Sequence, residues 1–447
     1  MRKCFLVALA AAAMFAVASP AASVAGGSKT HSCPPGTSNS AYCECPPGTS
    51  DSAYCECPPG TSDSAYCECP QRTEDSANSR DTKDFAACAC PSAASETGYP
   101  ATLFVPAGYA TIGAAVAAAP PGSRIIVGPG TYKEDVTVTK PLTIVGHDAT
   151  VDATNLNNGF TVPTPGAGTR IDGFTIENAV GEGILAVSTS NLCIVHNTVE
   201  NNDKGLPPAV STYAQCLPSA GGPGDCGEGV HLMSTTDSWI VGNTIRDNAG
   251  GVLLTDEIGP TDGNVVAHNR VLDNTADCGI TLAGHNPAAA PGGIPNPAAG
   301  GVYNNLIADN VANGNGVAGQ GAGVLLAAGL PTGGGAVYDN TVSGNSLSGN
   351  GLAGVTVHNH VPGQDLNGNR IVFNRIGTNN VDGDPDFPVA DPSTTGVFVG
   401  TADALTITIK HNVISSNTDG IFLTGPVSLA QIVHNVFTGV TNDIVGP

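Results

Sequence analysis

The chain has 447 residues, of which 41% are hydrophobic and 12% are charged, and its formal net charge at pH 7 is -22. This composition allows a large buried core and excludes the charged, apolar-poor kind of disorder. It also argues against nucleic acid as a partner, because phosphate binding needs clustered cations, and an acidic polysaccharide would need a bridging cation.

Residues 1–25 have the features of a secretory signal peptide. A basic start precedes an apolar run from Phe5 to about Val17, and small residues surround the expected cleavage point after Ala25. A transmembrane anchor is the weaker interpretation, because the run is shorter than the roughly 20 residues that cross a bilayer. No later segment has that length. We therefore expect a secreted or cell-surface protein without a transmembrane segment.

Residues 26–98 contain a cysteine-rich repeat of twelve residues and a polar linker. The unit CPPGTSNSAYCE is followed by two copies of CPPGTSDSAYCE. In a secreted chain this spacing predicts disulfides, the simplest pairing being Cys33 with Cys43 and likewise in each later unit. A metal-thiolate site is an alternative, although no histidine lies among these cysteines. The chain has 14 cysteines, and loss of Cys4 leaves an odd number, so one thiol is free or forms an intermolecular disulfide.

Residues 99–447 begin with a segment that we expect to close one end of a larger fold. The pattern predicts a short helix over 111–118, then strands over 124–127, 135–138 and 142–145. A stack of strands needs such a cover, because an exposed core and unpaired strand edges promote aggregation.

Asparagine pairs five residues apart recur along the rest of the chain. The pairs are 197/202, 243/248, 269/274, 305/310, 340/345, 369/374 and 412/417. An aliphatic residue lies two positions after the first asparagine of every pair, and a Gly-aliphatic-x-aliphatic strand such as GVLL follows the second. Three short strands per repeat and no helical period predict one coil of a parallel β-helix. Stacked coils would place equivalent asparagines in ladders of side-chain amides.

These segments resemble a known superfamily. VGPGTYKEDVTV, LTIVG, IDGFTIEN and the N-x-[VI]-x-x-N coils are similar to right-handed parallel β-helix proteins of the pectin lyase-like superfamily, including its NosD-like branch. The resemblance covers about residues 100–447. It implies an all-β, right-handed solenoid with a short capping helix, but it does not select an activity, because the superfamily contains lyases, hydrolases, esterases, epimerases and non-enzymatic proteins.

Variable loops mark one face as the place for a groove. Loop length changes before the Gly-aliphatic strands, as in 203–228, and after them, as in 283–300, but the asparagine turn is constant. The outward residues of the strand between these loops would then form the floor of a groove. The predicted floor residues that could contact a substrate are His231, Thr255, Thr281, Thr356 and Thr424.

Carboxylates and imidazoles occupy matching positions just beyond this floor. The candidates for acid, base or metal-ligand roles are Asp256, Glu257, His285, His358 and His360. The alternative is that they are solvated loop residues. The histidines beside the asparagines, His196, His268, His411 and His434, are interpreted as structural.

Asp382, Asp384 and Asp386 alternate within the loop NNVDGDPDFPVADP. This spacing can converge oxygen ligands on calcium, although the loop lacks the glycine and late glutamate of an EF-hand. A merely acidic loop is the alternative. Bound calcium would allow an acidic protein to bind an acidic glycan.

Three functions stay open from the sequence. The first is a β-helix protein that binds a polysaccharide or cell-surface glycan along the groove without turning it over. The second is a calcium-assisted polysaccharide lyase or epimerase. The third is a NosD-like role in metal-site maturation. Signatures of polygalacturonases, pectin methylesterases and pectate lyases are absent, and Trp239 is the single tryptophan. This absence favours the first function.

Overall fold

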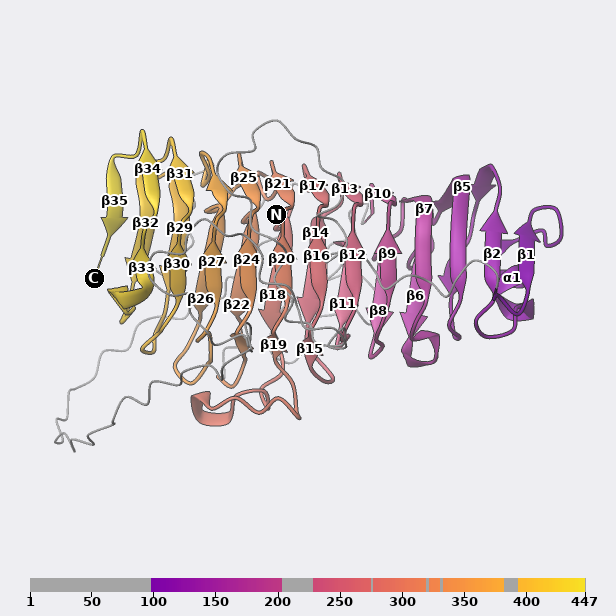
Figure 1. Cartoon of the computed structure of the whole chain (residues 1–447), viewed down its shortest axis with the longest axis horizontal. Coiled ribbons are helices and arrows are strands. Elements are labelled where there is room, and N and C mark those ends of the chain that lie inside the picture. The colour runs from indigo at the N-terminus through magenta and orange to yellow at the C-terminus, as the bar shows by residue number, and fades with distance from the viewer. Residues whose placement is uncertain are drawn as a thin grey trace, which may run out of the picture. The chain divides into compact units, whose positions relative to one another are not determined.

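The computed structural model describes residues 98–202, 228–274, 276–318, 321–329, 333–381 and 393–446. Within these ranges the chain forms a solenoid of parallel strands that lie in sequence order from β1 (Thr102–Val105) to β35 (Asn442–Val445) (Figure 1). The predicted parallel β-helix is confirmed. In the described part of the chain, no helix is long and apolar enough to cross a membrane. The signal peptide, the cysteine repeats and the loop cysteines Cys216 and Cys226 lie outside it.

A short helix covers the first coil, as the sequence predicted. Helix α1 (Ile112–Ala118) begins after Thr111, whose hydroxyl accepts the N–H of Ala114 at 3.1 Å. The carboxylate of Glu134 accepts the N–H groups of Ile112 and Gly113, each at 2.8 Å. These bonds satisfy backbone donors that have no partner inside the helix. The apolar face of α1 is thereby fixed over the end of the core.

One sheet, which we call sheet B, carries one strand of almost every coil. Its neighbours in space are β4 (Val136–Thr137), β6 (Phe160–Pro163), β8 (Ile184–Val187), β11 (Glu228–Met233), β14 (Gly250–Thr255), β18 (Ile280–Gly284), β22 (Val324–Ala328), β26 (Val355–Asn359), β29 (Thr395–Gly400), β32 (Asp419–Thr424) and β35. All pairings are parallel. Alternate residues such as Val252 and Leu254 point into the core, so Leu253 and Thr255 point outward.

The rest of each coil forms sheet A, which has two columns of strands. The first column contains β1, β2 (Arg124–Val127), β5 (Thr143–Asp152), β7 (Arg170–Glu177), β9 (Cys193–Val195), β12 (Trp239–Val241), β16 (Val265–Ala267), β20 (Leu306–Ala308), β24 (Thr341–Ser343), β27 (Arg370–Val372), β30 (Thr408–Lys410) and β33 (Ile432–Val433). The second contains β3 (Gly130–Tyr132), β5, β7, β10 (Thr198–Glu200), β13 (Thr244–Arg246), β17 (Arg270–Leu272), β21 (Val311–Asn313), β25 (Ser346–Ser348), β28 (Arg375–Ile376), β31 (Val413–Ser415) and β34 (Val436–Thr438).

A third, small sheet lies between sheet B and sheet A in the middle coils. It consists of β15 (Thr261–Asp262), β19 (Val302–Tyr303) and β23 (Val337–Tyr338). Short 3-10 helices occur in loops at Thr164–Gly166, Pro291–Gly293 and Leu429–Gln431. The rings of Tyr303 and Tyr338 stack with centroids 4.9 Å apart.

The asparagines form three ladders in the described residues. The first contains Asn197, Asn243, Asn269, Asn310, Asn345, Asn374, Asn412 and Asn435; the second Asn202, Asn248, Asn274, Asn315, Asn350, Asn379 and Asn417; the third Asn264, Asn305, Asn340 and Asn369. The predicted alignment was therefore wrong in the middle coils. There the first member of each pair, such as Asn305, belongs to the third ladder, and the second member continues the first ladder.

In the first ladder, the residue before each asparagine, and not the asparagine itself, adopts the left-handed backbone conformation. His196, His268, His411 and His434 occupy this position in the first ladder, with φ between 54° and 58°. Other coils place Gly242, Asp309, Gly344 or Phe373 there; Gly and Asp accept this conformation readily, whereas a bulky residue such as Phe373 does so rarely. These histidines therefore lie at a turn beside sheet A, away from the outer face of sheet B.

Glycines form a continuous stack where each coil enters sheet B. A Cβ built on Gly251 would lie 2.1 Å from the carbonyl oxygen of Gly279 in the next coil, and one on Gly279 would lie 2.8 Å from that of Gly323. A Cβ on Gly279 would also lie 2.8 Å from the side-chain nitrogen of the ladder residue Asn315. The glycine of each Gly-aliphatic-x-aliphatic repeat is thus required by close packing between coils.

Candidate functional site

Two columns of side chains point outward along sheet B, in the register that the sequence predicted. One column contains Leu185, His231, Leu253, Thr281, Leu325, Thr356, Phe398 and Phe422; the other contains Val187, Met233, Thr255, Ala283, Ala327, His358, Gly400 and Thr424. The neighbouring positions on each strand point into the core.

Most of this outer face is buried rather than open. His231, Thr255 and Thr356 are each no more than 1% exposed, whereas Thr281 and Thr424 are partly exposed. Only these last two of the five predicted floor residues are accessible to a ligand without movement of neighbouring groups. The alternation of a strand shows which way a side chain points, but it does not show what covers that side chain.

Asp256 fixes the long loop that follows β18. Its Oδ1 accepts the N–H groups of His285 at 2.6 Å and Asn286 at 3.0 Å, and its Oδ2 accepts the N–H of Gly301 at 2.6 Å. The carboxylate thereby ties both ends of the 285–301 loop to β14. Asp256 is completely buried, and burial raises its pKa from 3.8 to about 6 against the opposing hydrogen bonds. It acts as a clamp for the loop.

Glu257 and His285 form a carboxylate-imidazole pair beside this clamp. His285 Nδ1 lies 2.8 Å from Glu257 Oε1, and the ring nitrogen donates because a carboxylate only accepts. The Glu257 side chain is 24% exposed. Burial raises its pKa, but the hydrogen bond and charge of His285, the charge of His231 and the Thr255 hydroxyl outweigh burial and lower the pKa from 4.5 to about 2. Glu257 is therefore ionised at neutral pH.

His358 and His360 form a separate pair further along the sheet. Their rings stack with centroids 5.0 Å apart and an interplanar angle of 3°. Burial, together with His360, lowers the pKa of His358 to about 3, and burial also lowers the pKa of His360. The register places one coil, represented by Gly329, between His285 and His360. The five predicted site residues thus form two groups instead of one.

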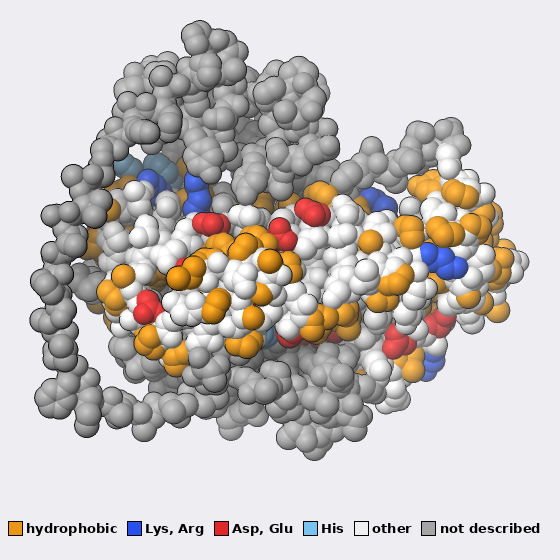
Figure 2. Space-filling view, turned by 90° about the horizontal axis from the view of Figure 1, so that it is seen from below, with side chains coloured by type: hydrophobic (Ala, Val, Ile, Leu, Met, Phe, Trp, Pro, Cys, Tyr) orange, Lys and Arg blue, Asp and Glu red, His pale blue; other side chains and the backbone are white. Residues whose placement is uncertain are grey.

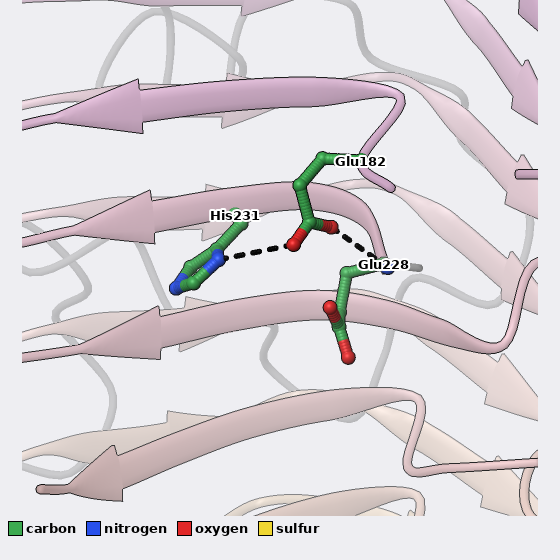
Figure 3. Close-up of side chains that lie close together, drawn as sticks. All are labelled: Glu182, Glu228 and His231. Atoms are coloured by element: carbon green, nitrogen blue, oxygen red, sulfur yellow. Dashed lines mark hydrogen bonds and ion pairs between the residues drawn. The ribbon is translucent and has the colours of Figure 1, made fainter. Parts of the chain in front are cut away.

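A third polar group, missed by the sequence prediction, joins β8 and β11. Glu182, Glu228 and His231 are all buried, and one ligand atom from each lies within 4.8 Å of the others (Figure 3). A sequence signal existed: Gly-Glu-Gly stands before both strands, at 181–183 and 227–229. Glu182 and Glu228 each stand directly before the glycine of the Gly-aliphatic-x-aliphatic repeat, whereas the predicted groove residues all follow that glycine.

Hydrogen bonds connect this group to Thr255 on the neighbouring strand β14. His231 Nδ1 lies 3.3 Å from Glu182 Oε1, and His231 Nε2 lies 2.8 Å from the Thr255 hydroxyl oxygen. Because a carboxylate only accepts, Nδ1 is the donor in the contact with Glu182, and the Thr255 hydroxyl then donates to Nε2 of the neutral ring. Polar contacts thus join β8, β11 and β14 across the outer face of the sheet.

Among the described strands, lysine and arginine occur in sheet A and not in sheet B. No strand of sheet B contains lysine or arginine. The strands of sheet A contain Arg124, Arg170, Arg246, Arg270, Arg370, Arg375 and Lys410. The side of the molecule in Figure 2 likewise shows few, scattered charges among apolar and uncharged polar atoms. The predicted calcium ligands Asp382, Asp384 and Asp386 lie outside the described residues.

Comparison with known proteins gives a family and several similar structures. The family described as right-handed β-helix region matches residues 152–376. No curated protein matches the sequence. The A-module of the Azotobacter vinelandii mannuronan C-5 epimerase AlgE4 is 16% identical, with 73% of this chain and 89% of that chain covered and a TM-score of 0.44.

Two further structures show the range of similar proteins. An alginate lyase from Paenibacillus sp. str. FPU-7 is 15% identical, with 76% and 99% covered and a TM-score of 0.44. A tailspike protein mutant of the E. coli bacteriophage HK620, in complex with a pentasaccharide, is 11% identical, with 73% and 61% covered and a TM-score of 0.41.

Proposed function

Because this chain belongs to the right-handed β-helix family, we propose that it is a secreted or cell-surface protein that binds a polysaccharide along the outer face of sheet B without changing it chemically. The observation that carries the proposal is the chemistry of that face. Its partly exposed side chains supply hydroxyl, aliphatic, thioether and aromatic groups, and its strands contain no lysine or arginine; these side chains are Val187, Met233, Thr281, Phe422 and Thr424. Hydroxyls and apolar surface together suit a sugar, whereas a uronate would lack a cationic partner on these strands.

The ionisable groups beside this face suit binding better than acid-base catalysis. A general acid or base works best when its pKa lies near the operating pH. The pKa of Glu257 is lowered to about 2 and that of His358 to about 3. Asp256 has a pKa of about 6, but it is fully buried and accepts three backbone N–H groups. It therefore has no free path to a substrate.

The loop held by Asp256 supplies a wall for the proposed site. Asp256 anchors both ends of the 285–301 loop. This loop directly follows β18, the strand on which Thr281 is partly exposed. A fixed wall loses little conformational entropy when a ligand binds. An acidic glycan would need calcium to bridge it to this acidic protein. Asp382, Asp384 and Asp386 remain the predicted calcium ligands.

The test is a binding screen of the full chain against neutral and uronate glycans, with and without calcium. We expect binding to a neutral glycan without calcium and no unsaturated product by ultraviolet absorbance. Thr281→Val removes one accessible hydroxyl at nearly constant volume and should weaken binding about five- to tenfold, the value of one hydrogen bond. Thr408→Val on sheet A is the matched control. Equal affinity of both variants, or no binding by the wild type, would reject the proposed site.

One observation favours a second function, a calcium-assisted lyase or epimerase. The partly exposed carboxylate of Glu257 and the imidazole of His285 are 2.8 Å apart, and such a pair can orient a base. Product formation that requires calcium and disappears in His285→Gln would establish this function. Binding without product would support the first one.

A further inference from the structure

Glu182, Glu228 and His231 converge in the protein interior at the entrance to sheet B. Glu182 stands two residues before β8, Glu228 begins β11, and His231 lies within β11. The side chains of His231 and Glu182 are 1% and 0% exposed, and Glu228 is 5% exposed as a residue. Figure 3 shows the His231 ring and the Glu182 carboxylate facing one another, with Glu228, which begins the same strand as His231, beside them.

The backbone holds the Glu182 carboxylate in place. Its Oε2 accepts the N–H of Glu228 at 2.8 Å, which leaves Oε1 directed at His231 Nδ1. The Oε1 to Nδ1 distance is 3.3 Å. Two donors at about 2.1 Å from one metal ion are separated by about 3.0 to 3.4 Å at the angles of octahedral and tetrahedral sites. The observed distance falls within that interval.

Thr255 orients the imidazole for coordination. If a cation took the place of the proton at Nδ1, the ring proton would lie on Nε2, which is 2.8 Å from the Thr255 hydroxyl oxygen and would donate to it. Histidines that bind metals usually donate their second ring N–H to an outer group, which fixes the tautomer. Thr255 is not one of the three converging residues, so it provides a separate indication of how the ring is used.

The charge of the cluster favours a cation. Two carboxylates and one imidazole, with ligand atoms within 4.8 Å of one another, lie together among buried groups, and this is a donor set that a divalent cation binds. A divalent ion would bridge the Nδ1 lone pair and both carboxylates. Two oxygens and one imidazole nitrogen form a ligand set of borderline softness, which suits zinc or manganese better than calcium.

We propose that Glu182, Glu228 and His231 bind one divalent transition-metal ion, such as zinc or manganese, that ties coil β8 to coil β11. This site is independent of glycan binding by the outer face. With three protein ligands, the remaining coordination positions are left for water or a further ligand. The ion would stabilise the fold and position Thr255 through His231.

The test measures metal binding to the full chain after removal of metal with a chelator. Titration with zinc should show one site that Glu228→Gln weakens at least a hundredfold and Thr255→Val weakens about ten- to hundredfold, as expected for an outer-shell partner. Glu177→Gln, a half-buried carboxylate variant on sheet A, should bind as the wild type does. Zinc should also raise the melting temperature of the wild type but not of Glu228→Gln.

Two controls keep the result specific. Cobalt bound by cysteine thiolates gives intense charge-transfer absorption, whereas an oxygen and nitrogen site does not, so spectra separate this site from the cysteine repeats. If Glu228→Gln fails to fold, the melting temperature of the wild type is measured instead. It should fall when a chelator removes the metal and recover when zinc is added back. Identical zinc affinity in wild type and Thr255→Val, or a melting temperature unaffected by metal, would show an ion pair only and overturn the proposal.

Discussion

Asp256 and Gly301 are joined by a 2.6 Å hydrogen bond from the Gly301 N–H to Asp256 Oδ2, although they are 45 residues apart in the chain. The other oxygen of the same carboxylate accepts the N–H groups of His285 and Asn286 at the opposite end of the loop. One buried side chain therefore determines where the wall of the proposed binding face begins and ends.

Asp256→Asn should release the Gly301 end of this loop. The amide oxygen can keep the bonds from His285 and Asn286, but the amide nitrogen would face the Gly301 N–H, donor against donor. A hydrogen bond to a charged group contributes about 1.5–3 kcal/mol, so exchange of the Gly301 amide should become roughly 10 to 100 times faster. Hydrogen-deuterium exchange checks this. Unchanged protection of residues 296–302 would contradict the role of Asp256.

Asp256 should also give folding stability a defined pH dependence. Its folded pKa of about 6 lies above the ordinary value of 3.8, so the folded state retains the proton to a higher pH than the unfolded state does. Its contribution is complete below about pH 4 and is lost as the pH rises to about 6, by up to about 3 kcal/mol. Urea unfolding of wild type and Asp256→Asn at several pH values measures the difference. A difference that does not fall with rising pH would refute this.

Glu257 should show the opposite dependence. Its folded pKa of about 2 lies below 4.5, so the ionised group stabilises the fold above about pH 4.5 and loses that effect as the pH falls to about 2. The expected loss is no more than about 3 kcal/mol. Glu257→Gln should therefore be less stable than the wild type at pH 7 and equally stable near pH 2. Thermal unfolding at both pH values tests this, and a pH-independent difference would exclude the ion pair as its cause.

The sequence predicted these neighbours because strand register is regular. The repeat GVLL at 251 aligns with GITL at 279, which places Glu257 beside His285. Burial was not predictable in the same way, because His231 and Thr356 point outward by alternation and yet are enclosed. The alternation of a strand shows in which direction each side chain points. Whether that side chain is covered depends on neighbouring loops, which have no repeating sequence pattern.

The ladder register illustrates a second limit. The spacing of five residues between Asn305 and Asn310 is the same as that between Asn269 and Asn274, although the two pairs occupy different turns. Spacing alone cannot distinguish them. The third ladder, which begins at Asn264, becomes recognisable only when three asparagines at intervals of five are read together.

Asn310 provides the strongest test of the ladders. It is 1% exposed; its Oδ1 accepts the N–H and the side-chain amide of Asn269, and its Nδ2 donates to Val266 O and Asn345 Oδ1. Asn310→Ala leaves several buried polar groups without partners and should lower the free energy of unfolding by about 4 kcal/mol. Chemical denaturation followed by the fluorescence of Trp239 measures the loss.

Asn435→Ala is the matched control at the end of the same ladder. Asn435 accepts two bonds from Asn412 and donates to Ile409 O, but it is only partly buried. Water can reach the groups that its removal exposes, so the expected loss is about 1–2 kcal/mol. Equal losses at Asn310 and Asn435 would mean that the amides stabilise each coil locally, and that stacking between coils contributes little.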